Sequence, residues 1–163
     1  WKEPKSKSFR TFNKERAEEI SDVLRNQSLE VTSVTSKEKK SFAPGLYDLT
    51  TLQREANRKY GYSAKQTLNI MQRLYENHKV LTYPRTDSRY IGKDIVPTIK
   101  ERLRACATGP YRKPAGALMN QPVRANGSFV DDKKVSDHHA IIPTEQFVQL
   151  DHMTNEERKI YDW

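Results

Sequence analysis

Helix start and stop signals between residues 48 and 77 constrain the fold of this chain more than any other feature. Asp48 and Ser63 are residue types that cap helix N-termini, and each precedes an apolar repeat with helical spacing. Ser63 also has Gln66 three residues later, which is the capping-box pattern. Gly61 stands where the first helix would end in the left-handed conformation. We therefore predict two helices joined by a tight turn, a helix-turn-helix unit.

The apolar residues of these two predicted helices fall on one face of each. In the first helix they are Leu49, Leu52, Ala56 and Tyr60, and in the second they are Ala64, Leu68, Met71, Leu74 and Tyr75. Both stripes have the spacing of helix faces that pack on a protein interior. We interpret them as core rather than as the lining of a ligand site.

Weaker signals predict the other elements. We expect helices from Asn13 to about Gln27, from Asp94 with Pro97 in the first turn, and from a Thr154–Glu157 capping box, the last being cut off at Trp163. Short strands are predicted over Leu29–Val34, Val80–Tyr83 and Phe129–Val130. Residues 109–127 hold three prolines and three glycines, so we predict a long loop there.

Composition limits the classes of partner. The hydrophobic fraction is 35%, the mean hydropathy is −0.91, and 29 basic against 21 acidic residues give a net charge of +8. Such a balance favours an anionic partner, of which nucleic acid is the commonest. Cys106 is the single cysteine, which excludes an internal disulfide, and no apolar run approaches the length of a membrane span. Because the chain begins at Trp1, we expect it to be a piece of a longer protein.

The stretch Leu81–Tyr90 carries a dense set of reactive side chains. It holds the phenol of Tyr83, two guanidinium groups, a carboxylate and three hydroxyl-bearing neighbours. Pro84 favours an extended conformation at the residue before it. In an extended chain Tyr83 and Arg85 project to the same side, about 6–7 Å apart. A phosphate held by Arg85 would then lie near the Tyr83 hydroxyl, which suits phosphoryl transfer to tyrosine.

Attack by Tyr83 on a phosphate would need assistance, because tyrosine has a pKa near 10 and only about one molecule in a thousand is ionised at pH 7. Arg85 can polarise the phosphate and favour the phenolate at once. His138 is a second candidate for contacting the phosphate, because near neutral pH an imidazole N–H can donate a hydrogen bond to it. The residues alone leave two simpler interpretations open: a half-buried Tyr83 beside a salt-bridged Arg85, and a His138 that caps or bridges loops.

Other polar residues of the stretch have two interpretations each. The hydroxyls of Thr82, Thr86 and Ser88 either contact phosphates or cap turns. Asp87 either pairs with Arg85 or Arg89, or it orients an arginine or bridges to another domain. We predict that Thr82, Asp87, Ser88 and Arg89 contact nucleic acid or another domain.

The adjacent pair His138-His139 raises the question of a metal site. In a strand, neighbouring side chains point to opposite faces, so the pair cannot readily chelate one ion. A metal-using relaxase would show His-x-His instead, and the sequence also lacks an Asp-x-Asp-x-Glu cluster for Mg²⁺. We therefore expect no metal site in this chain.

Three stretches of the chain resemble one known family, in which they occur in the same order along the sequence. The decapeptide centred on Tyr83 resembles the active-site signature of type IA DNA topoisomerases, most closely bacterial topoisomerase III. The segment from Pro44 to Tyr75, which includes Leu46–Asn57, and the segment Asp137–Thr144 match the same family. The resemblance covers nearly the whole chain.

The resemblance implies an α+β, mainly helical fold. Residues 44–163 would form a tyrosine domain like the winged helix of CAP, with the helix-turn-helix, and residues 1–43 part of a β-rich arch, or gate. Members of this family cut one DNA strand with a tyrosine, hold the 5′ phosphate as a phosphotyrosine ester, pass another strand through and rejoin the first without ATP. In this sequence the nucleophile would be Tyr83, with Arg85 and His138 at the scissile phosphate.

The resemblance also implies partners that this chain lacks. The family's Toprim domain, which binds Mg²⁺ and carries an acidic cluster and a catalytic Glu and Lys, has no counterpart here. We expect Mg²⁺ in the parent protein through that domain, no cofactor in this chain, and no activity of the chain alone. The expected partners are single-stranded DNA and the remaining domains of the parent, with no membrane, in the bacterial cytoplasm at the nucleoid.

Two rival functions remain. One is a non-catalytic, winged-helix-like nucleic-acid-binding module in which Tyr83 only packs or stacks. A covalent adduct between the parent protein and DNA would discriminate against it. The other is a tyrosine recombinase, which would show the order Arg…His-x-x-Arg…Tyr with the nucleophile last. Tyr83 precedes His138, which argues against a recombinase.

Overall fold

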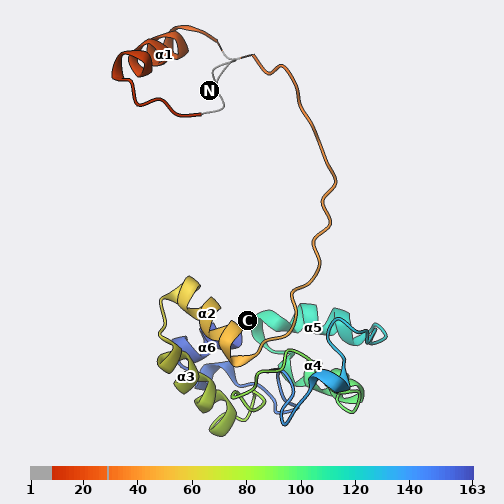
Figure 1. Cartoon of the computed structure of the whole chain (residues 1–163). Coiled ribbons are helices and arrows are strands. Elements are labelled where there is room, and N and C mark those ends of the chain that lie inside the picture. Colours follow the sequence, from red (N-terminus) through yellow and green to blue (C-terminus); the bar gives the residue numbers. More distant parts are fainter. Residues whose placement is uncertain (1–8, 29) are drawn as a thin grey trace. The chain divides into compact units, whose positions relative to one another are not determined.

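The computed structural model describes residues 9–28 and 30–163, and the chain divides into two units between Ser41 and Phe42. In the first unit, helix α1 runs over Lys14–Asn26, and the predicted cap is confirmed because Asn13 Oδ1 accepts a hydrogen bond from the Arg16 backbone N–H at 3.1 Å. No residue of α1 is buried. Figure 1 shows the helix and the extended segment that follows it.

The prediction of a strand over Leu29–Val34 is wrong for the residues of this range that the structure describes. Residues 30–46 form neither helix nor strand, and Leu29 lies outside the described residues. Val31 and Val34 are 77% and 86% exposed. A strand requires a neighbour to pair its N–H and C=O groups, and the described part of the chain offers this segment no such neighbour.

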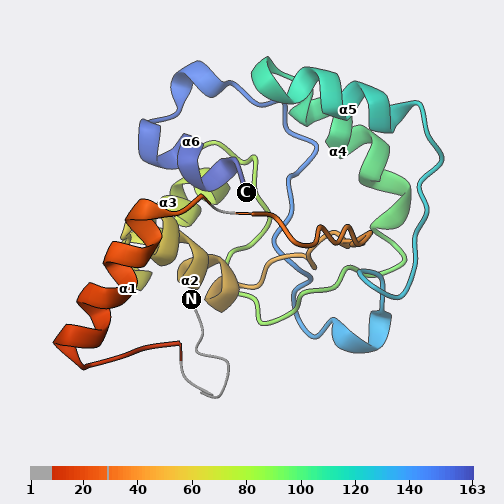
Figure 2. The ribbon, with the colours of Figure 1, turned by 90° about the horizontal axis from the view of Figure 1, so that it is seen from above.

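The second unit is mainly helical, as predicted. Its α-helices are α2 (Leu49–Tyr60), α3 (Ala64–Glu76), α4 (Ile99–Cys106), α5 (Arg112–Met119) and α6 (Asn155–Tyr161). Short 3₁₀ turns occur at Val96–Thr98, Gly109–Tyr111, Asp132–Lys134 and Leu150–His152. Helix α3 packs against α2 and α6, and α4 packs against α5, so the helices form two groups joined by long irregular segments (Figure 2).

Most of the local signals around α2, α3 and α6 behave as expected. Asp48 Oδ1 accepts from the Thr51 N–H at 2.6 Å, and Gly61 ends α2 with φ of 71°. Ser63 Oγ caps α3 by accepting from the Gln66 N–H at 3.1 Å, but the predicted capping box is only half formed. The Gln66 side chain donates to Glu156 Oε1 at 3.1 Å instead, and no hydrogen bond among the described residues joins it to the Ser63 N–H. The capping box that opens α6 is complete in both directions, and α6 runs to Tyr161.

Two predictions about the middle of the chain are wrong. Asp94 does not cap a helix, because a 3₁₀ turn over Val96–Thr98 leads into α4 without a side-chain cap. The loop expected over residues 109–127 contains a 3₁₀ turn and α5. Pro110 and Pro114 lie in the first turns of these elements, where a backbone N–H has no intrahelical partner, so proline is tolerated there.

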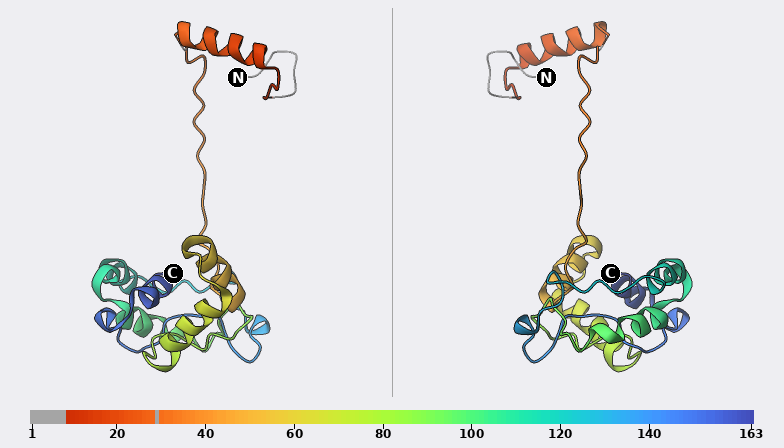
Figure 3. Two further views of the ribbon diagram at one scale, coloured as in Figure 1. Left: turned by 90° about the vertical axis from the view of Figure 1, so that its left-hand side faces the viewer. Right: turned by 90° about the vertical axis from the view of Figure 1, so that its right-hand side faces the viewer.

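Extended pairing in the described residues is limited to isolated bridges, and Figure 3 shows no strand arrow in the ribbon. The bridged pairs are Tyr47 with Ile141, Leu81 with Pro143, and Ile91 with Val130. The predicted strands over Val80–Tyr83 and Phe129–Val130 are therefore reduced to one bridged residue each. The winged-helix and arch architectures stay predictions.

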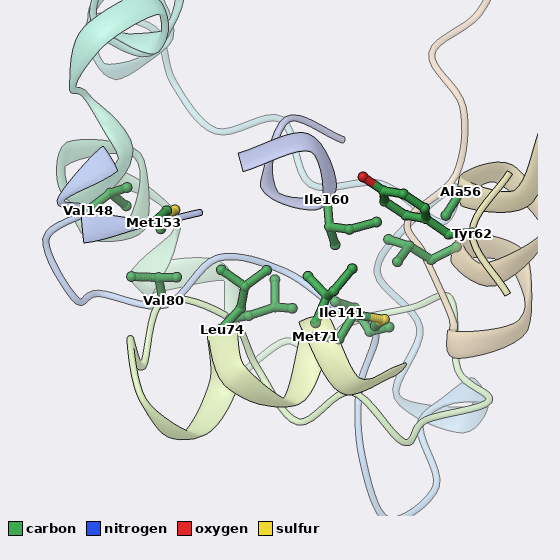
Figure 4. Close-up of a cluster of buried hydrophobic side chains, with 12 residues drawn as sticks. Ala56, Tyr62, Met71, Leu74, Val80, Ile141, Val148, Met153 and Ile160 are labelled. Carbon is green, nitrogen blue, oxygen red and sulfur yellow. The ribbon is translucent and has the colours of Figure 1, made fainter. Parts of the chain in front are cut away.

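The core of the second unit forms where α2, α3 and α6 meet the segments that carry the sequence motifs (Figure 4). Its members include Leu52, Ala56, Ile70, Met71, Leu74, Val80, Leu81, Ile141, Val148, Met153 and Ile160. Most of the two predicted stripes is therefore buried or packed against this core. Ala64 and Tyr75 are the exceptions, because both are exposed, Tyr75 by 37%. Truncating a core residue such as Leu74 to alanine would cost about 2–5 kcal/mol.

Candidate active site

The segment that carries Tyr83 is fixed to the segment that carries His138 through Thr82. The Thr82 backbone N–H donates to the Ile142 carbonyl at 3.0 Å. The Thr82 hydroxyl accepts from the Ile142 N–H at 2.9 Å and donates to the Ala140 carbonyl at 3.3 Å. These three bonds place Tyr83 beside the histidine pair, although the two segments are more than fifty residues apart in sequence.

Burial alternates along the residues that follow Tyr83. The buried members are Pro84, Thr86 and Ser88, and the exposed members are Arg85, Asp87 and Arg89. A period of two is the pattern of an extended chain with one face on the protein and the other in solvent. Tyr83 is itself partly exposed, so it belongs with Arg85 on the accessible side.

Two aromatic rings contact the Tyr83 ring. The Tyr83 and His138 ring centroids are 4.3 Å apart with an interplanar angle of 41°, and Tyr75 meets Tyr83 edge-on at 5.5 Å and 76°. The His138 side chain is exposed, while its carbonyl accepts a hydrogen bond from the Thr86 hydroxyl at 3.0 Å. The backbone of His138 is therefore fixed, and its imidazole faces both Tyr83 and solvent.

Two surface hollows meet at His138. One, of about 700 Å³, is lined by Tyr83, and the other, of about 500 Å³, is lined by Arg85; His138 lines both. Among the described residues, no ion pair or hydrogen bond engages the Arg85 guanidinium, so the salt-bridged Arg85 of the simpler interpretation is not found. An anion beside His138 would have Tyr83 on one side and an unpaired Arg85 on the other.

Other predicted site residues have partners within the fold. The Ser88 hydroxyl donates to the Lys134 carbonyl at 2.7 Å, and Arg89 Nε donates to the Leu46 carbonyl at 2.8 Å. Asp87 accepts from the Ser136 hydroxyl at 3.4 Å, and no ion pair joins it to an arginine in the described part of the chain. These contacts position the stretch, and a role of these residues toward DNA or another domain stays a prediction.

One positioning group was not predicted from the sequence. Glu157 is 3% exposed and accepts from Arg73 Nε at 2.7 Å and from His78 Nε2 at 3.2 Å. Burial alone would raise the pKa of Glu157, but the hydrogen bonds from Arg73 and the Thr154 N–H, together with the charge at His78, lower it below its ordinary value. The sequence had indicated only the helix-capping role of Glu157. Its carboxylate also fixes the turn that leads from α3 to Tyr83.

No three His, Cys, Asp or Glu side chains of the described residues gather closely enough to hold a metal ion. The two adjacent histidines also differ in environment, because His139 Nδ1 lies 2.7 Å from the Ala140 carbonyl oxygen while His138 faces Tyr83. None of the helices within residues 9–28 and 30–163 is long and apolar enough to cross a membrane.

Comparison with known proteins identifies the family of this chain. The sequence profile of a family described as DNA topoisomerase matches residues 1–163. The chain belongs to the DNA topoisomerase family. The predicted resemblance to the type IA enzymes, and to topoisomerase III among them, is confirmed.

Several relatives named DNA topoisomerase 3 align with nearly the whole chain. That of Bacillus thuringiensis (strain Al Hakam) is 60% identical over 162 residues, which are 99% of this chain and 22% of the relative. Those of Bacillus licheniformis and Bacillus subtilis (strain 168) are 48% and 46% identical with the same coverage. The chain therefore spans about a fifth of the length of these topoisomerases.

The three stretches that carried the resemblance converge in this topoisomerase chain. The Leu49 N–H donates to the Thr86 carbonyl at 3.0 Å, and the Ile141 N–H donates to the Tyr47 carbonyl at 2.8 Å. With the Thr82–Ile142 bonds, each stretch is hydrogen-bonded to both of the others. Sequence segments that are distant in the chain thus build one surface around Tyr83.

Proposed function

We propose that the parent protein of this chain is a type IA topoisomerase that cuts one DNA strand with Tyr83, passes another strand through the break and rejoins the first. In the cleavage step the Tyr83 oxygen forms a bond to the phosphorus. The bond to the 3′ oxygen breaks, and that oxygen leaves with a proton. The 5′ phosphate stays attached as a tyrosine ester, so reversal by the 3′ hydroxyl restores the strand without ATP.

The observation that carries this proposal is the placing of Tyr83 beside His138 at the meeting of two surface hollows, one of which holds an unpaired Arg85. Arg85 would offer its guanidinium fork to the phosphate, which gains negative charge as the tyrosine attacks. His138 would donate a hydrogen bond to the same phosphate. The fixed charge of Arg85 would also lie near the Tyr83 oxygen as it attacks.

The other residues of the stretch would act around this centre. Thr82 holds the segment in place, and Asp87, Ser88 and Arg89 would lie along the DNA strand or against another domain of the parent. Of these, the exposed Asp87 is the better candidate for a domain contact, because a carboxylate repels phosphate.

Mg²⁺ would be held elsewhere in the parent protein, in the Toprim domain that the family resemblance implies. When bound, the ion would supply positive charge at the phosphates of the strand. The tyrosine half and the acidic half of the active site would then lie on separate domains. The chain alone would bind single-stranded DNA and leave it uncut, and the parent would work in the cytoplasm at the nucleoid.

The experiment compares the intact parent protein with its Tyr83→Phe variant. A labelled single-stranded oligonucleotide is incubated with each protein and Mg²⁺, quenched with denaturant and separated on a denaturing gel. We expect a covalent adduct with the unmodified protein and none with Tyr83→Phe, while both bind the oligonucleotide with similar affinity. An adduct formed by the Phe variant would refute the assignment of Tyr83.

A further inference from the structure

The larger hollow beside Tyr83 contains two side chains that the proposed reaction does not use. Tyr75 comes from the last turn of α3, and Lys79 follows three residues after the helix ends. The hollow has a volume of about 700 Å³, within the range of about 300–1,000 Å³ that is usual for small-molecule sites. Its position means that a strand attacked by Tyr83 would run along it.

Tyr75 is a large aromatic side chain that the fold leaves accessible. It lies on the apolar stripe predicted for α3, yet it is 37% exposed, whereas Leu74 beside it is fully buried. The Tyr75 and Tyr83 rings are nearly perpendicular, so Tyr83 covers at most one face of the Tyr75 ring. An exposed aromatic ring beside a phosphate-handling group is the arrangement that binds unpaired bases by stacking.

Lys79 has an unusual backbone. With φ of 57°, it is the one non-glycine residue of positive φ among those described. A lysine in this region carries conformational strain, which persists where the surroundings impose it and is often found at functional sites. Here the Lys79 carbonyl accepts from the Thr144 hydroxyl at 2.6 Å, and His78 before it is held by Glu157. The strained turn directs the chain so that the exposed Lys79 side chain lines the hollow.

The side chains that line the hollow differ in what they can bind. The Lys79 ammonium attracts a phosphate, whereas the Tyr75 ring offers a face to an uncharged base. Glu76, next to Tyr75 in α3, also lines the hollow, and its carboxylate repels a phosphate. The base therefore belongs with Tyr75 and the phosphate with Lys79.

We propose that this hollow is a nucleotide-binding subsite in which Tyr75 stacks on a base of the single strand being cut and Lys79 binds the phosphate next to that base. The inference rests on the proposed function, because it presumes that the strand reaches Tyr83. It goes further by assigning two residues that hold the strand in register with the nucleophile.

The test measures binding in the intact protein carrying Tyr83→Phe, so that no cleavage interferes. The probe is a single-stranded oligonucleotide in which one 2-aminopurine is moved position by position past the cleavage site. We expect its fluorescence to be quenched at one position by stacking. Tyr75→Leu should abolish that quenching and weaken binding about 5- to 150-fold, and Tyr75→Phe should keep both.

Lys79→Asn removes the ammonium group, and asparagine tolerates the left-handed backbone. It should reduce the slope of log K against log salt concentration by about 0.7, the value for one phosphate contact on a single strand. Lys100→Gln, an equal charge change on the exposed face of α4 outside the hollow, should leave the slope unchanged. Circular dichroism checks that each variant is folded.

The subsite is refuted if folded Tyr75→Leu binds like the parent with unchanged quenching, or if Lys79→Asn and Lys100→Gln have the same slope. The covalent adduct of the unmodified protein is measured separately. A normal adduct together with either of those binding results overturns the subsite and leaves the proposed function intact.

Discussion

Glu157 gives the sharpest prediction about stability. Its buried carboxylate is the common acceptor of Arg73, His78 and the Thr154 backbone N–H, so Glu157→Ala removes three contacts at once. Breaking a buried charge pair costs about 3–5 kcal/mol. The lower end applies here, because the Arg73 side chain is 40% exposed and water can replace its lost partner. We therefore expect a loss of about 3 kcal/mol in the free energy of unfolding, or roughly 10 °C in Tm.

The effect should depend on pH in a defined direction. The pKa of Glu157 is lowered in the folded protein from its ordinary value of 4.5. A carboxyl group with a lowered folded-state pKa stabilises the fold above its unfolded pKa, and this contribution is lost as pH falls through the folded-state pKa. The difference between the unmodified protein and Glu157→Ala should therefore be full at pH 7 and shrink below about pH 4.5.

The assay is urea unfolding of the chain at pH 7 and at a series of lower pH values, followed by circular dichroism. Glu156→Gln is the matched control, because Glu156 is an exposed carboxylate on the same turn that accepts a hydrogen bond from Gln66 Nε2 at 3.1 Å. It should change stability by less than about 0.5 kcal/mol. Equal effects of the two substitutions, or a Glu157→Ala effect that is the same at every pH, would refute the reasoning.

Three further predictions concern the surface around Tyr83. In the parent protein, Arg85→Ala should lower strand cleavage about 100- to 1,000-fold, because it removes a charged donor to the phosphate. Arg89→Ala should act mainly on stability, because it removes the hydrogen bond to the Leu46 carbonyl. Equal, mild effects of the two substitutions on cleavage would contradict this prediction. Thr82→Val removes the hydroxyl shared by Ala140 and Ile142 and should cost about 1–3 kcal/mol in urea unfolding; an unchanged midpoint would show that the bonds do not matter. The chain alone should bind single-stranded DNA more weakly as salt rises and form no adduct until the rest of the parent is added, and an adduct without that addition would refute the division of the site.

Helices whose signals are local could be predicted from the sequence. The caps at Asp48, Ser63 and Thr154 and the stop at Gly61 each depend on residues a few positions away, and all four form. The strands could not be predicted in the same way. Apolar and polar residues alternate over Leu29–Val34 as in a strand, but a strand also needs a second segment to pair with its backbone. The described residues do not provide such a segment.

Part of the site could be predicted from the sequence, again where the geometry is local. Pro84 and the alternation after it allowed Arg85 to be placed on the side of Tyr83, because that geometry is local. The approach of His138 to Tyr83 came only from the family resemblance, since no pattern in one sequence reports a contact across more than fifty residues. Tyr75 was assigned to the core because it follows Leu74 on the apolar stripe, and only the structure shows it exposed.

The central claim is that Tyr83 becomes covalently attached to a 5′ phosphate. The most direct measurement uses the intact parent protein, Mg²⁺ and two versions of one oligonucleotide, labelled at the 3′ or the 5′ end, followed by protease digestion of the adduct and mass spectrometry. A 5′-phosphotyrosine ester retains the downstream piece of the strand, so label should remain on the protein only from the 3′-labelled version, on the peptide that contains Tyr83. Attachment of the 5′-labelled piece, or a nucleotide on any other residue, would contradict the account.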